Sequence, residues 1–159
     1  MSVLDWNDMM KRDRCKQNSF ALIALLSAQG CAYNPVGTRA EQEEDMREAV
    51  LLHLIHSKKQ PSVVFIRVNN TDPSPRFLQR FSGYGFTAKP VSQSSWRNGS
   101  VIDPLSGKWS RIYEVSKVSW IDTKSAEVEG GYKYEGGTYL VNWSGTQWQV
   151  VKSTINYIS

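Results

Sequence analysis

The chain has 159 residues, of which 40% are hydrophobic and 21% are charged, and its net charge is +4. This composition is typical of a globular protein with one domain, and it excludes an intrinsically disordered chain. The basic residues beyond position 16 are scattered along the sequence, which argues against nucleic acid as a partner. We therefore expect one folded domain with a mildly basic, solvated surface.

The first thirty residues carry the features of an export signal. Four basic residues at positions 11–16 precede an apolar segment at 19–28, and the sequence AQGC follows at 28–31. A positive region, an apolar stretch of about 7–15 residues and a small-residue cleavage site define a secretory signal peptide. The apolar stretch is shorter than the roughly 20 residues that span a bilayer. We predict a signal peptide over residues 1–30, with Met10 as an alternative translation start.

The AQGC sequence resembles the lipobox of bacterial lipoproteins. In that family a diacylglycerol is attached to the cysteine, the chain is cut just before it, and the new amino terminus is acylated. The resemblance implies a mature chain that begins at lipidated Cys31, has the lipid bilayer as its partner, and continues through a tether over 31–38. Because Ala32 follows the cysteine, the resemblance also implies the bacterial cell envelope, at the periplasmic face of an outer membrane in a Gram-negative cell. The alternative is a short buried helix over 19–31 with a free cysteine.

The sequence from Thr38 to Pro61 predicts the longest helix of the domain. Thr38 and Glu41, three residues apart, form a capping box, and Pro61 ends the pattern. Two histidines, His53 and His56, lie three positions apart on this helix and could share a metal ion, although His53 also fits a core or boundary position. The sequence supplies no third ligand at metal-site spacing, so we predict no metal and no other cofactor. The apolar stripe of the helix consists of Met46, Ala49, Val50, Leu51, Leu52, Leu54 and Ile55.

The next elements are a strand and a short helix. The β-branched run at 62–68 predicts a strand. Ser74 as N-cap and Pro75 at the first helical position predict a helix that ends at Gly83. Its predicted buried side chains are Phe77, Leu78 and Phe81. Residues 92–108 are polar and rich in turn formers, and the DPLSGK sequence within them predicts a hairpin connection.

From Trp109 onward, apolar and polar residues alternate. The apolar phase changes near Ser116, which predicts a β-bulge. Turns predicted at 135–137 and 144–146 divide this region into the strands of an antiparallel meander with one buried face. The predicted fold class is α+β: a long N-terminal helix and a short helix pack on one face of a curved antiparallel β-meander, as a single domain over 39–159.

This order of elements resembles the cystatin-like and nuclear-transport-factor-2-like folds, in which helices cover one face of a curved antiparallel sheet. The resemblance rests on the order of elements over residues 38–158. The nuclear-transport-factor-2-like group includes isomerases and dehydratases as well as binding and assembly modules, so the fold alone does not select a function.

The sequence contains no evident acid–base pair, nucleophile motif or phosphate loop. Asp72, Asp103 and Asp122 lie at predicted turns, where aspartate is common for structural reasons. We therefore predict no catalytic residue and favour a non-enzymatic binding or scaffolding domain, whose partner is an unidentified envelope protein or a small ligand. The alternative is a small pocket enzyme or ligand carrier of the nuclear-transport-factor-2-like kind.

The candidate binding site is the aromatic side of the predicted meander. Its large side chains share the phases that alternation assigns to the face covered by the helices. They form either a packed core or a partly open pocket, and both interpretations remain at this point. The residues concerned are Trp120, Tyr132, Tyr139, Trp143 and Trp148.

Overall fold

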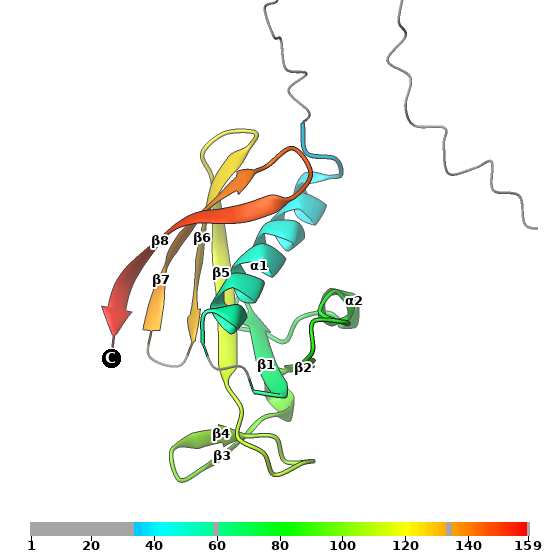
Figure 1. Cartoon of the computed structure of the whole chain (residues 1–159), viewed down its shortest axis with the longest axis vertical. Helices are drawn as coiled ribbons and strands as arrows, with labels where there is room; N and C mark the ends of the chain where they lie inside the picture. Colours follow the sequence, from blue (N-terminus) through cyan, green and yellow to red (C-terminus); the bar gives the residue numbers. More distant parts are fainter. Residues whose placement is uncertain (1–33, 59–60, 133–134, 159) are drawn as a thin grey trace, which may run out of the picture. The chain divides into compact units, whose positions relative to one another are not determined.

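The computed structural model describes residues 34–58, 61–132 and 135–158. Residues Ala32–Ser159 form one compact unit, in which helix α1 (Arg39–His56) lies across a six-stranded sheet (Figure 1). The predicted signal peptide and Cys31 lie outside the described residues. The other elements are β1 (Val63–Val68), α2 (Pro75–Gln79), β2 (Thr87–Pro90), the 3₁₀ turn η2 (Val91–Gln93), β3 (Ser95–Arg97), β4 (Ser100–Ile102), β5 (Ile112–Trp120), β6 (Ser125–Tyr132), β7 (Glu135–Trp143) and β8 (Trp148–Ile158).

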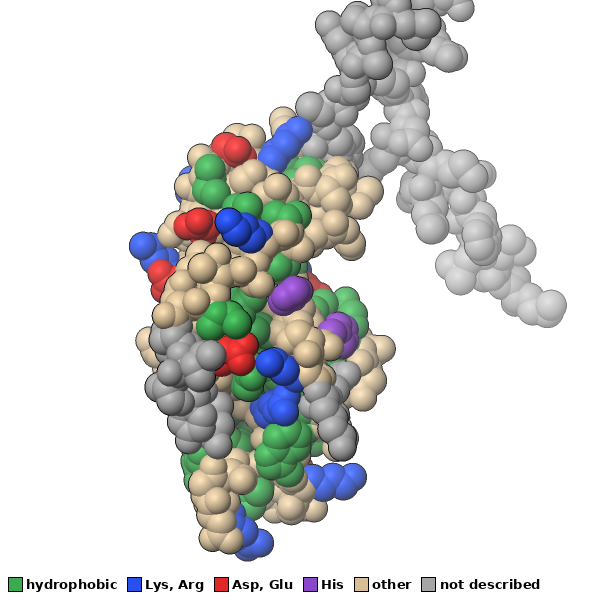
Figure 2. All heavy atoms as spheres, turned by 60° about the vertical axis from the view of Figure 1, so that its left-hand side comes forward, with side chains coloured by type: hydrophobic (Ala, Val, Ile, Leu, Met, Phe, Trp, Pro, Cys, Tyr) green, Lys and Arg blue, Asp and Glu red, His purple; other side chains and the backbone are tan. Residues whose placement is uncertain are grey.

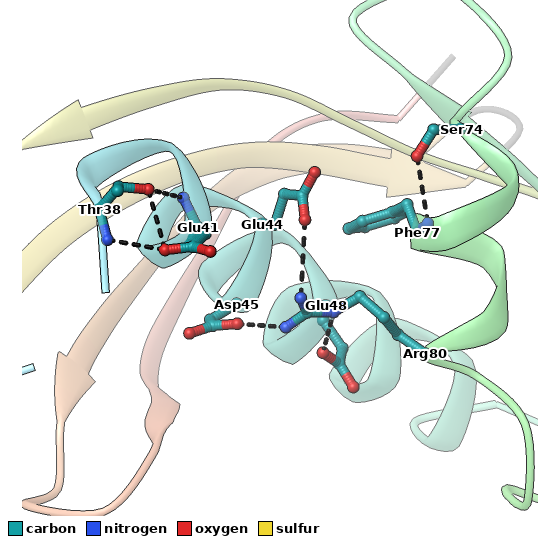
Figure 3. Close-up of polar contacts among 8 residues, drawn as sticks. All are labelled: Thr38, Glu41, Glu44, Asp45, Glu48, Ser74, Phe77 and Arg80. Carbon is teal, nitrogen blue, oxygen red and sulfur yellow. Dashed lines mark hydrogen bonds and ion pairs between the residues drawn. The ribbon is translucent and has the colours of Figure 1, made fainter. Parts of the chain in front are cut away.

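Helix α1 begins at the predicted capping box. The Thr38 hydroxyl accepts a hydrogen bond from the Glu41 backbone N–H at 3.3 Å, and the Thr38 N–H donates to the Glu41 carboxylate at 2.8 Å (Figure 3). These bonds satisfy two backbone N–H groups that a bare helix end would leave unpaired. Its buried residues come from the predicted stripe: Met46, Val50, Leu51, Leu54 and Ile55. The core position considered for His53 is wrong, because His53 is exposed and its ring contacts the Tyr139 ring at 5.8 Å.

The sheet has the strand order β2-β1-β5-β6-β7-β8 and is mostly antiparallel. Strands β5 to β8 pair with their neighbours in sequence, and a shift in register between Val115 and Val118 confirms the predicted bulge. The turn at 144–146 is also confirmed, with a hydrogen bond from the Ser144 N–H to the Gln147 carbonyl. The sequence pattern sets no direction for β1, and this strand pairs in parallel with both β2 and β5. Parallel neighbours need a crossover connection, and the chain between β1 and β2 supplies one that contains α2.

The turn predicted at 135–137 is wrong. Strand β7 already begins at Glu135, so both glycines of that segment lie inside a strand. Close backbone approach requires glycine at one position in each of the two strands: a Cβ on Gly137 of β7 would lie 2.3 Å from the Thr154 carbonyl oxygen, and one on Gly131 of β6 would lie 2.2 Å from that of Glu135. The glycines in this hairpin therefore let adjacent strands come together, and they do not turn the chain.

The main core lies between the helices and the sheet. Helix α2 has the predicted cap, with the Phe77 N–H donating to the Ser74 hydroxyl at 3.1 Å (Figure 3). Phe77 and Phe81 are buried as predicted, whereas Leu78 is half-buried. Arg80, at the C-terminal end of α2, ties it to α1 through ion pairs with Glu44, Asp45 and Glu48.

A second, smaller apolar cluster lies on the opposite face of the sheet, since Phe65 alternates along β1 with residues of the main core. Its members are Val63, Phe65, Val101 and Ile112. The β3–β4 hairpin covers this cluster. Asn98 and Gly99 turn this hairpin with φ angles of 51° and 74°, the left-handed values that a two-residue type I′ turn requires.

The segment after β4 is the predicted DPLSGK connection. The Asp103 N–H donates to the Lys108 carbonyl at 2.9 Å, which confirms a chain reversal here. The Asp103 side chain is buried and accepts hydrogen bonds from the Ser106 hydroxyl at 2.7 Å and from the Lys89 ammonium at 2.9 Å. The hydrogen bond from Ser106 has the larger effect, and the two bonds together lower the pKa of Asp103 to about 2. The buried carboxylate thus fastens this connection to strand β2.

Candidate functional site: a notch beside the β3–β4 hairpin

The five aromatic residues predicted as a site occupy different environments. Tyr139 and Trp148 are buried in the main core, and Trp120, Tyr132 and Trp143 are half-buried and pack against it. The Trp148 ring contacts those of Trp120 and Trp143 at centroid distances of 5.7 and 5.8 Å, both edge-on. Tyr132 and Trp120 each line a different surface hollow. The aromatic side chains on this face of the sheet therefore belong mainly to the packed core. Tyr132 and Trp120, at its margins, each reach a surface hollow.

One of the two hollows is a cavity of about 460 Å³ between the β3–β4 hairpin and the sheet, which we call the notch. Glycines in β6 and β7 line part of it. The residues that give it its chemical character are Trp96 of β3, Trp109 and Arg111 of the segment before β5, Glu114 of β5, and Glu129 and Tyr132 of β6. The notch thus combines aromatic rings with charged groups of both signs.

Arg111 is held between two of these rings. Its guanidinium carbon lies 4.8 Å from the centre of the Trp109 ring and 5.6 Å from that of Tyr132. Its Nη1 atom is buried and makes no hydrogen bond within the described residues. The Tyr113 hydroxyl interacts with the guanidinium, but no carboxylate described lies within ion-pair distance. A partly desolvated cation without an anion raises the free energy of the folded state, and the two rings offset part of this cost. An anionic ligand that pairs with Arg111 would therefore be bound favourably at this site.

The neighbouring charges are already compensated. Arg67 pairs with Glu114 at 3.3 Å. Glu135 accepts a hydrogen bond from the Tyr132 hydroxyl at 2.6 Å and lies 3.5 Å from the Lys58 ammonium. The hydrogen bond from Tyr132, together with Lys58, lowers the pKa of Glu135, so this carboxylate is ionised at neutral pH and engaged elsewhere. The same hydrogen bond fixes the position of the Tyr132 ring against which Arg111 lies.

Two tryptophans of the notch are open to solvent. Trp96 is 57% exposed and Trp109 is 46% exposed. Large exposed aromatic side chains that meet in a cavity are typical of binding sites. Sequence reasoning missed both of them and Arg111. The signal that could have located them is Asn98-Gly99, since this dipeptide between short apolar segments predicts a hairpin.

The other residues singled out in the sequence have structural roles or lie on the surface. Asp103 and Asp122 each accept a hydrogen bond from a backbone N–H within a local turn, as expected for aspartate there. Asp72 accepts one from the Ser92 N–H of η2 and so ties two distant segments together. Both histidines reach the surface, on a face where acidic and basic side chains are interspersed (Figure 2). Across the described ranges, no group of three or more His, Cys, Asp and Glu side chains is arranged to hold a metal ion. None of the helices described there is long and apolar enough to cross a membrane.

Comparison of the chain with protein-family models, with curated proteins and with solved structures finds no match. Its function is therefore inferred from the notch and from the residues that precede the domain.

Proposed function

We propose that this protein is a lipid-anchored protein of the bacterial cell envelope whose domain binds a small ligand in the notch without chemical turnover. The lipobox-like sequence that ends at Cys31 supports the anchor. One observation carries the binding role: Arg111 lies between two aromatic rings, beside two exposed tryptophans, with no carboxylate partner described. A partly buried guanidinium of this kind can bind an anionic group of a ligand through charge-assisted hydrogen bonds.

The position of the notch supports this proposal. The tether enters at the N-terminal end of α1, and Cys31 precedes Asn34 by three residues, which span at most about 11 Å. Helix α1 has 18 residues and is therefore roughly 27 Å long. Lys58, just beyond its far end, contacts the Tyr132 ring of the notch, and the β3–β4 hairpin lies at the opposite end of the domain from the start of α1 (Figure 1). A chain anchored at Cys31 would therefore present the notch to ligands at a distance from the bilayer.

We also propose a cystatin-like or nuclear-transport-factor-2-like fold in which β5–β8 form a curved meander. The packing of α1 against the consecutive strands β5–β8 supports this assignment. A pocket enzyme of that kind would place its reacting groups between sheet and helix. That space holds fully buried apolar side chains such as Val50, Val128 and Val141. The notch lies outside that space, which favours a binding protein over the enzyme.

The anchor is tested by expressing the full chain in a Gram-negative host and analysing its N-terminal peptide by mass spectrometry. We expect the wild-type chain to be cut before Cys31, to carry acyl groups on that residue and to fractionate with membranes. The Cys31→Ser variant should carry no acyl group and remain uncut at this site, since the thiol is the attachment point. The matched control is Cys15→Ser, which should behave as wild type because Cys15 leaves with the signal peptide. An unmodified Cys31, or a cellular protein that retains residues 10–30, would overturn the anchor.

A further inference from the structure

We infer that the ligand of the notch is a free small molecule that carries a carboxylate next to a flat ring. The carboxylate pairs with Arg111, and the ring lies against Trp96 and Trp109. This inference rests on the proposed binding role of the notch and specifies the chemistry of its ligand.

The preference for an anion follows from the lack of a described ion-pair partner at Arg111, and not from the sum of the charges that line the cavity. Arg67 has Glu114 as its partner, and Glu135 is engaged by Lys58 and Tyr132. Glu129 is exposed, so water screens its charge, whereas Arg111 is partly buried. The charge of Arg111 is thus the least compensated of those lining the notch among the described residues. Carboxylates suit it because a guanidinium presents parallel N–H donors that match their two oxygens.

The demand for a ring follows from the two exposed tryptophans. Trp96 comes from the hairpin and Trp109 from the segment that leads into β5, and both line the cavity. Offset or edge-on contacts between aromatic rings are favourable beyond the area that they bury. The volume of about 460 Å³ lies within the range of roughly 300–1,000 Å³ that is usual for small-molecule pockets, which favours a free small molecule over a protein segment.

The site is also arranged before the ligand arrives. Trp109 and Tyr132 hold the guanidinium, and the hydrogen bond to Glu135 holds Tyr132 in turn. A charged side chain that is already fixed loses little conformational entropy when it pairs with a ligand. A small carboxylate therefore meets Arg111 in a geometry that needs little rearrangement.

The test uses the purified full chain labelled with 5-fluorotryptophan, with ¹⁹F NMR as the readout. Benzoate is compared with benzyl alcohol, which keeps the ring without the charge, with acetate, which keeps the charge without the ring, and with benzylammonium, which reverses the charge. We expect benzoate to bind about tenfold or more tightly than benzyl alcohol and benzylammonium, since the loss of a hydrogen bond to a charged group weakens binding by at least this factor. Benzoate should also bind severalfold more tightly than acetate, because acetate lacks the ring. The signals of Trp96 and Trp109, assigned by Trp→Phe substitution, should shift, and that of buried Trp148 should not.

Variants locate the binding. Arg111→Gln should reduce the preference for benzoate over benzyl alcohol to about twofold or less. Because Arg111 is partly buried, Trp96→Ala gives a second test: Trp96 is exposed, so its removal should weaken benzoate binding severalfold without lowering the denaturation midpoint. The matched control is Arg97→Ala, since Arg97 is an exposed arginine of the same hairpin outside the notch lining, and it should bind benzoate as wild type does.

Three results would overturn the inference: equal affinity for benzoate and benzyl alcohol, unchanged preference in Arg111→Gln, or the absence of shifts at Trp96 and Trp109. Equal affinities with shifts at both tryptophans would refute the carboxylate and leave the binding role of the notch intact. The acylation of Cys31 is measured separately, so a failure of the anchor leaves the ligand chemistry standing.

Discussion

The two faces of the sheet differ in how they are covered. Under α1 and α2, buried apolar side chains from both helices and from most strands form one continuous cluster. Under the β3–β4 hairpin, a small apolar cluster is accompanied by the buried carboxylate of Asp103 and its bond to Lys89. Because apolar burial is the main source of folding free energy, the helical face stabilises the domain. The hairpin face is covered incompletely, and the incomplete cover is what leaves the notch open.

The largest expected effect comes from the tryptophans on the helical face. Trp148 is buried, so Trp148→Ala should lower the free energy of unfolding by about 3–5 kcal/mol, measured by chemical denaturation. Trp143→Ala is the matched substitution at the margin of the same face, and its cost should be clearly smaller because Trp143 is half-buried. Equal losses of unfolding free energy in the two variants would show that Trp143 is as much part of the core as Trp148.

A matched pair of valines compares the two faces directly. Val141 is buried in the main core and Val101 in the hairpin cluster. Val141→Ala should destabilise the whole domain by about 2 kcal/mol, because it removes buried methyl groups and leaves a cavity. Val101→Ala should mainly increase hydrogen exchange in β3 and β4, with a smaller change in global stability. If both variants lowered the global midpoint equally, the hairpin would be part of the same cooperative unit as the helices.

The smallest effect is confined to acid pH and to the hairpin face. Since the pKa of Asp103 is lowered to about 2, its ionised form stabilises the folded state. This contribution is complete above the unfolded pKa near 4 and is lost as the pH falls towards 2. Hydrogen exchange of β3 and β4 amides, corrected for the intrinsic effect of pH, should therefore accelerate over that range.

The control for this pH dependence is Asp103→Asn. In this variant, hydrogen exchange in the hairpin should already be faster than in the wild type at pH 5. It should not accelerate further between about pH 4 and pH 2, where the wild type does. Identical pH profiles in the variant and the wild type would show that another group controls the acid sensitivity of this segment.

Local patterns predicted those features of the fold that local chemistry determines. The capping box at Thr38, the cap at Ser74 and the bulge before Val118 each depend on residues close in sequence. The parallel pairing of β1 was missed because the alternation within one strand carries no information about the direction of its neighbour. The glycines at 135–137 were misassigned because the backbone that crowds Gly137 belongs to Thr154, far along the chain.

The candidate site was less accessible to sequence reasoning. The aromatic phase of the meander correctly marks one face of the sheet, but most of its members pack against the core. The notch combines Trp96, Arg111 and Tyr132, which lie in three separate segments. Their proximity results from the hairpin folding back over β5, and no periodicity in the sequence encodes that. The same holds for the lack of a counter-ion at Arg111, which becomes visible only when its neighbours are known.

Strand β8 also affects how the protein behaves in solution. It forms one edge of the sheet, and residues 151–156 are exposed on both of its faces. An open edge can pair with an edge from another molecule, and here two register shifts against β7 and the charge of Lys152 oppose such pairing. Salt screens the repulsion between two lysines but leaves the exposed Val151 and Ile155 unchanged. Concentrated solutions of this protein are therefore expected to be colloidally less stable in high salt than in low salt.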